Sequence, residues 1–110
     1  MSHEYLMFRS APGLDPQDAA DDGAFEGLGS LDELSNAISR VFPSLQWKPS
    51  RVNAAVVTGG PAPEFLLNAE ADGQVHSFTM SRASSSQTND LATVLRLSAL
   101  DMESGEVVQP

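Results

Sequence analysis

The fold is decided by residues 64–82, EFLLNAEADGQVHSFTMSR. Asp72-Gly73 near its middle is typical of a two-residue type I′ hairpin turn. A turn of that length places Phe65 opposite Met80, Leu67 opposite Phe78 and Ala69 opposite His76. These six side chains share one face of the hairpin because side chains alternate along a strand. The other face carries Glu64, Asn68, Glu70, Ser77, Thr79 and Ser81, together with Leu66 and Val75.

This register also decides the interpretation of His76. Its face is apolar, its cross-strand neighbour is Ala69, and no second histidine stands at ligand spacing. We therefore interpret His76 as a structural histidine of the core or its rim, and not as a metal ligand or general base. The run Ser84-Ser85-Ser86 is interpreted as a solvated loop leading to a helix cap, since no Gly-x-Ser-x-Gly elbow surrounds it.

Two helices are expected on either side of the hairpin. Ser30-Leu31-Asp32-Glu33 has the form of a capping box, and apolar residues then recur at helical spacing until Pro43 ends the helix. The apolar stripe is Leu31, Leu34, Ile38, Val41 and Phe42. A second helix is predicted to begin near 88–90 with Asn89 as its cap, and its inner face is predicted to comprise Leu91, Val94, Leu95 and Ser98.

The remaining strands are expected at residues 5–8, at 52–58, and in a terminal hairpin over 99–108 that turns near Gly105. Trp47 lies between two prolines and is interpreted as a plug of the core. The sequence thus predicts a single domain over residues 1–110. Its fold class is α+β, with an antiparallel sheet of about four or five strands and two helices packed on one face.

Charge is the strongest compositional signal. The chain has 15 Asp and Glu against 6 Lys and Arg, a net charge of −9, and no basic residue between Arg9 and Arg40. We call residues 10–29 the acidic segment and expect a long loop or mobile stretch there, because Gly, Pro, Ala and Asp abound. Its carboxylates are the predicted partner-binding residues: Asp15, Asp18, Asp21, Asp22 and Glu26.

Such a field favours a basic protein partner and disfavours nucleic acid and anionic membranes. Plain solubility is the competing explanation of the same charge. The oligomeric state is left open. Cysteine is absent, which excludes a disulfide scaffold, a thiol nucleophile and a Cys-based zinc site. The first residues lack the pattern of a signal peptide, and no apolar stretch approaches a membrane span, so a cytoplasmic protein is expected.

Three segments resemble a family of small bacterial proteins: residues 41–47 (VFPSLQW), 72–79 (DGQVHSFT) and 100–106 (LDMESGE). Members of that family are often encoded beside contact-dependent or type VI secretion toxins and resemble immunity proteins. The resemblance implies an antitoxin role. It carries over no functional residue.

The function expected from the sequence is that of an acidic protein-binding module, most specifically an immunity-like inhibitor of a cytosolic toxin. The alternative is a secretion-system accessory or adaptor protein without inhibitory activity. An enzyme is not expected, because no nucleophile, base and orienting group can be assembled, and no metal or other cofactor is predicted. Genes beside this one would separate these possibilities.

Overall fold

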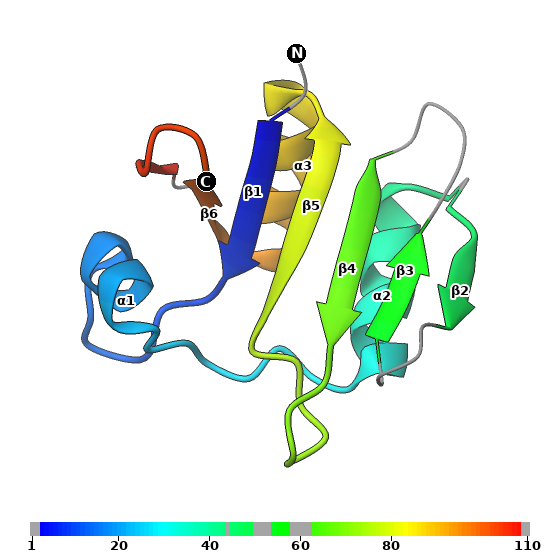
Figure 1. Cartoon of the computed structure of the whole chain (residues 1–110), viewed down its shortest axis with the longest axis horizontal. Helices are drawn as coiled ribbons and strands as arrows, with labels where there is room; N and C mark the ends of the chain where they lie inside the picture. The colour runs from blue at the N-terminus through cyan, green and yellow to red at the C-terminus, as the bar shows by residue number, and fades with distance from the viewer. Residues whose placement is uncertain (1–2, 44, 50–53, 58–62, 109–110) are drawn as a thin grey trace.

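An antiparallel sheet runs through the protein, and Figure 1 views it from the side opposite its two longer helices. The structure is a computed structural model that describes residues 3–43, 45–49, 54–57 and 63–108. Within these ranges the sheet has seven strands in the order β2-β3-β4-β5-β1-β6-β7. Their bounds are β1 His3–Phe8, β2 Trp47–Pro49, β3 Ala54–Val57, β4 Glu64–Asn68, β5 Ser77–Ala83, β6 Ser98–Asp101 and β7 Val107–Val108.

The predicted pairing of β4 with β5 is confirmed. Phe65 lies opposite Met80 and Leu67 opposite Phe78, and all four side chains are buried. Leu66, between the two buried residues of β4, is 42% exposed. One face of the hairpin therefore belongs to the core and the other faces outward, as the alternation predicts.

The predicted tip of this hairpin is wrong. Gly73 donates to the carbonyl of Glu70 at 2.9 Å, and Glu70 donates to the carbonyl of Gln74 at 2.8 Å. Gly73 alone has a positive φ, 81°, whereas a type I′ turn at Asp72-Gly73 needs positive φ at both residues. The loop is thus three residues long with glycine in the left-handed position, so the ladder does not extend to Ala69 and His76.

Val75 explains the change. Its N–H donates to the carbonyl of Gly29 at 2.8 Å, and its carbonyl accepts from Leu28 at 2.7 Å. Val75 pairs with the end of the acidic segment instead of with β4, and its side chain is fully buried, not outward as predicted. A contact this distant in sequence lies beyond local turn rules.

Two helices pack on the same face of the sheet, α2 Leu31–Val41 and α3 Ser85–Leu95. Leu34 and Ile38 of α2 and Leu91 and Ala92 of α3 join the buried residues of β1, β4, β5 and β6 in one core. The α+β fold with two helices on one face is confirmed. The sheet has seven strands and not the expected four or five. Two of the seven, β2 and β7, are only three and two residues long.

The ends of α2 follow the sequence. Ser30 caps it through the predicted box with Glu33, and the helix ends just before Pro43. Trp47 is half-buried against the core, and its indole N–H donates to the hydroxyl of Ser39 at 2.7 Å. This position agrees with a plug of the core.

The start of α3 was predicted too late in the chain. Ser84 is the N-cap, and it forms a capping box with Gln87 that the serine run conceals. Asn89 is therefore an exposed residue inside the helix. Of the predicted inner face, Leu91 is buried and Leu95 packs against the core, but Val94 is 62% exposed and Ser98 lies in β6. The other buried residues of α3 are Thr88 and Ala92.

The acidic segment is not a loop throughout, because it contains α1, Pro16–Asp22. The sequence holds the signals for this helix. Asp15 accepts from the N–H of Gln17 as N-cap, Pro16 occupies the first turn, and Gly23 ends the helix with φ 67°. Figure 1 shows α1 on the β6 side of the sheet, where it contacts the edge strand β7.

The outer strands agree with the sequence where they are described. β1 covers the predicted residues 5–8, and β6 and β7 form the terminal hairpin with Gly105 at φ 75°. Of the predicted strand over 52–58, the described residues Ala54–Val57 form β3. The rest of that prediction lies outside the described residues.

Replacing one inward and one outward residue of β5 tests the register. Phe78→Ala removes a ring that is 2% exposed and is expected to cost about 3–5 kcal/mol of unfolding free energy. Thr79→Ala, on the outward face, is expected to cost less than about 1 kcal/mol. Denaturant titrations measure both. A larger loss for Thr79 than for Phe78 would mean that the strand is displaced by one residue.

The start of α3 is tested by a second pair. Ser84→Ala is expected to lower the unfolding free energy by about 1 kcal/mol, because the N–H of Gln87 loses its acceptor. Asn89→Ala is expected to be neutral or to stabilise by up to about 0.7 kcal/mol, since alanine is the better residue inside a helix. A larger loss of thermal stability for Asn89→Ala than for Ser84→Ala would mean that Asn89 is the N-cap.

Candidate functional site

The predicted partner-binding residues lie on and around α1. Asp18, Asp21 and Asp22 are exposed on the helix, and Asp15 is exposed at its cap. Glu26 follows the helix, half-buried, and its N–H donates to the carbonyl of Arg9 at 2.8 Å. The structure therefore brings four exposed carboxylates to one short helix and its cap. Their role in binding stays a prediction.

The acidic segment is attached to the sheet at two places. At its start, the N–H of Glu26 donates to the carbonyl of Arg9, which follows β1, at 2.8 Å. Within the segment, Ser10 bridges to Phe25, and Ala11 donates to the carbonyl of Ala24 at 3.0 Å. The Phe25 ring lies 4.7 Å from the ring of Phe8, which is fully buried. At its end, the segment pairs with Val75. Aromatic packing and backbone hydrogen bonds thus hold α1 against the sheet.

Basic side chains do not neutralise this segment within the described residues, where no Lys or Arg forms an ion pair with any of the five carboxylates. Arg9, the basic residue that precedes the segment, is directed elsewhere. Its Nη2 donates to the carbonyl of Leu95 at 2.8 Å, at the end of α3. An arginine in that place satisfies carbonyls that the helix itself leaves without donors.

A hollow of about 610 Å³ lies where the acidic segment meets the β4–β5 tip. It is lined by Gly23, Phe25, Glu70, Ala71, Asp72, His76 and Ser77. Gly23 caps the carbonyl end of α1, which carries partial negative charge, and Glu70 and Asp72 add two carboxylates. The hollow is suited to a cationic group.

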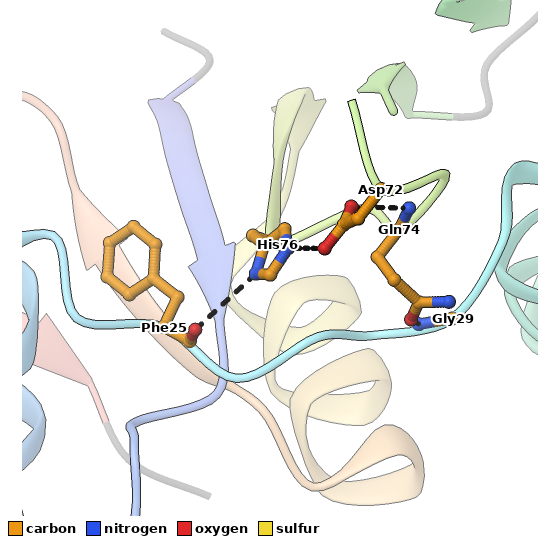
Figure 2. Close-up of polar contacts among 5 residues, drawn as sticks. All are labelled: Phe25, Gly29, Asp72, Gln74 and His76. Carbon is orange, nitrogen blue, oxygen red and sulfur yellow. Dashed lines mark hydrogen bonds and ion pairs between the residues drawn. The ribbon is translucent and has the colours of Figure 1, made fainter. Parts of the chain in front are cut away.

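His76 links the two sides of this hollow, as Figure 2 shows. Its Nε2 lies 3.1 Å from Oδ2 of Asp72, and its Nδ1 lies 3.5 Å from the carbonyl of Phe25. Asp72 also accepts from the N–H of Gln74 at 2.9 Å, while the Gln74 side-chain oxygen accepts from the N–H of Gly29 at 3.1 Å. The tip is therefore tied to both the middle and the end of the acidic segment.

These contacts shift two pKa values in opposite directions. Hydrogen bonding to Asp72 raises the pKa of His76 above its ordinary 6.5, and the contact with Phe25 adds to the effect. The N–H of Gln74, followed by His76, lowers the pKa of Asp72 below its ordinary 3.8. The contribution of the pair to stability is therefore complete between pH 3.8 and 6.5. It is lost as the pH falls through the lowered pKa of Asp72 or rises through the raised pKa of His76.

His76 thus lies on the rim of the protein and not on the apolar face of the hairpin. Both of its ring nitrogens have partners, Phe25 and Asp72. Local sequence patterns could not show this placement, because it depends on the contact of His76 with Phe25, which is 51 residues away in the sequence.

Among the described residues, no group of three or more His, Cys, Asp or Glu could hold a metal ion. No helix in the same ranges combines the length and the apolar content that crossing a bilayer requires.

Comparison with protein-family models, with curated proteins and with solved structures gives no match in any of the three. The resemblance to immunity proteins therefore stays a prediction that rests on the three short segments.

A proton titration tests the link at His76. In NMR spectra its imidazole is expected to titrate above 6.5 in the wild type and closer to 6.5 in Asp72→Asn, because the main hydrogen-bond partner loses its charge. Glu70→Gln, a more distant carboxylate, is the control and is expected to have a smaller effect. Equal titration of His76 in the wild type and in Asp72→Asn would contradict the link.

The same link predicts a pH dependence of stability. A raised pKa in the folded state means that the contribution of His76 is complete below pH 6.5 and is lost as the pH rises through the folded value. The difference in thermal midpoint between the wild type and His76→Gln is therefore expected to be larger at about pH 6 than at about pH 8.5. A difference that grows with pH would have the wrong sign.

Proposed function

We propose that this chain is a non-catalytic, acidic protein-binding module of the bacterial cytoplasm whose partner is a basic protein. Its most specific form is an immunity-like inhibitor that occupies a toxin. The proposal rests on the acidic segment, whose helix α1 presents exposed carboxylates and whose two ends are attached to the sheet. Within the described residues its carboxylates have no cationic partner of their own.

The electrostatics support a basic partner. A net charge of −9 repels phosphate backbones and anionic lipids and attracts cationic surfaces. Attachment of α1 to the sheet also matters, because carboxylates on an ordered element lose less conformational entropy on binding than those on a mobile chain. The neighbouring hollow offers Glu70 to a lysine or arginine of the same partner, whereas Asp72 is paired with His76.

The alternative function is an adaptor of a secretion apparatus, which would use the same acidic surface without inhibiting its partner. Native co-purification followed by mass spectrometry identifies the partner in either case. If the captured protein is a toxin, its co-expression with this chain is expected to restore growth, and Asp21→Asn/Asp22→Asn is expected to weaken the rescue. A basic partner whose activity is unchanged when bound would favour the adaptor.

Association kinetics with that partner test the acidic segment directly. Neutralising all five carboxylates with Asn or Gln is expected to slow association about tenfold or more at low salt, and to change dissociation less. Asn at position 15 keeps the helix cap, so the thermal midpoint is expected to stay nearly unchanged. Surface plasmon resonance over a salt series is the measurement, and the difference is expected to narrow as the Debye length approaches about 8 Å.

A double variant with the same change in net charge as Asp21→Asn/Asp22→Asn provides the control. Asp32→Asn/Asp90→Asn removes two exposed carboxylates of α2 and α3, away from α1, and is expected to slow association less than Asp21→Asn/Asp22→Asn. Superimposable association rates for all variants at every salt concentration would contradict a binding role and leave solubility as the explanation of the charge.

A further inference from the structure

The outward face of the central strands, which we call the open face, carries a row of residues that are cross-strand neighbours. Leu66 of β4 lies opposite Thr79 of β5, Thr79 opposite Leu6 of β1, and Leu6 opposite Leu100 of β6. We call these four residues the open-face row. Three of the four are leucines, and none belongs to the core beneath α2 and α3.

Helices do not cover this row in the described part of the chain. Figure 1 looks onto the open face, and both α2 and α3 lie behind the sheet. Leu66 is 42% exposed, and Leu6 and Leu100 are half-buried. Phe8 lies two residues after Leu6 on the same face of β1, but it is fully buried because the ring of Phe25 packs on it. The acidic segment thus covers one end of this face, and the open-face row, in which Leu66 is exposed and the other three residues are half-buried, begins beside it.

A second row, two residues further along the strands, is acidic. Glu4 lies opposite Ser81, and Ser81 opposite Glu64. A groove of about 260 Å³ separates the two rows and is lined by Glu4, Glu64, Phe65, Leu66, Thr79 and Ser81. Rows two residues apart are about 6.7 Å from each other, which is close to the reach of a lysine or arginine side chain.

The protein already places one guanidinium in the acidic row. Arg82 is left without a strand partner, because the register of β1 with β5 shifts between His3 and Glu4. Its φ is 58°, and its Nη1 lies 2.9 Å from Oε1 of Glu64. The Glu4 carboxylate forms no ion pair within the described residues and is exposed.

We propose that the open face docks a cationic amphipathic helix of a partner protein, whose apolar side chains cover the open-face row while its lysines or arginines reach Glu4 and Glu64. The inference rests on the proposed function, because the docked helix belongs to the same basic partner. A second copy of this chain is a poor occupant, since two molecules of charge −9 repel each other.

The dimensions suit a helix. Strands are about 4.8 Å apart, so the row from β4 to β6 spans about 14 Å, which matches nine or ten residues of helix at about 1.5 Å each. An apolar stripe at i, i+3, i+7 and i+10 fits that length.

The probe is a helical peptide of about 18 residues with leucine on one face and lysine on the other, a length at which helix formation becomes favourable. Isothermal titration calorimetry measures its affinity, and NMR shift changes locate it on the protein. The strongest shifts are expected at the open-face row. A peptide of the same charge with glutamine in place of leucine is expected to bind at least about tenfold more weakly.

Two lysine substitutions with the same effect on net charge separate docking from general attraction. Leu66→Lys is expected to weaken binding at least about tenfold, because it removes apolar contact and repels the peptide. Val94→Lys replaces an exposed apolar residue of α3, on the other layer, and is expected to change affinity less than about twofold. Thr79→Lys is the second open-face variant if Leu66→Lys unfolds.

Equal affinities for Leu66→Lys and Val94→Lys, or shifts confined to the acidic segment, would overturn the inference. A dimer in analytical ultracentrifugation that Leu66→Lys dissociates would assign the open face to a second copy and would also overturn it. Failure of the proposed function looks different. In that case the variant with all five carboxylates of the acidic segment neutralised associates with the partner protein as fast as the wild type does. This result does not depend on the effect of Leu66→Lys on the affinity for the peptide.

Discussion

The pairing of β4 with β5 is the constraint on which the rest of the structure depends. Because side chains alternate, one register places Phe65 and Leu67 in the core and Leu66 outside it. Phe65 is central to the core, since its ring lies 6.0 Å from that of Phe78 and 5.9 Å from that of Trp47. A slip of one residue would exchange the two faces of the strand. The helix-covered face and the open face therefore have a single cause.

Local rules predicted the parts of the fold that local interactions determine. The register of β4 and β5 and the cap of α2 at Ser30 follow from alternation and from a capping box, which involve residues close in sequence. Val75 could not be placed by such rules, because its backbone partners are Leu28 and Gly29. The missed start of α3 is different in kind, since the Ser84 and Gln87 pair was present in the sequence.

The candidate site also has features that the local sequence predicts and features that depend on contacts between distant segments. The acidic residues were predictable from composition alone, and the cap at Asp15 together with Gly23 was available as a local sign of α1. The hollow was not predictable, because it forms only when residues 23–25 meet residues 70–77. His76 bonds across that junction to Phe25, and a polar bridge between distant segments leaves no periodic trace in the sequence. Its role follows from tertiary structure alone.

One register gives this sheet a face sealed by two helices and an open face, to which we assign the docking of a partner. Paramagnetic relaxation of leucine methyl groups by a soluble neutral gadolinium chelate tests it most directly, because Leu66 and Leu67 are neighbours in sequence on opposite faces. We expect the Leu66 methyls to relax several-fold faster than those of Leu67, and to lose most of that excess when the cationic helical peptide is bound. Equal rates for the two leucines in the unbound protein, or a Leu66 rate unchanged at saturating peptide, would contradict the account.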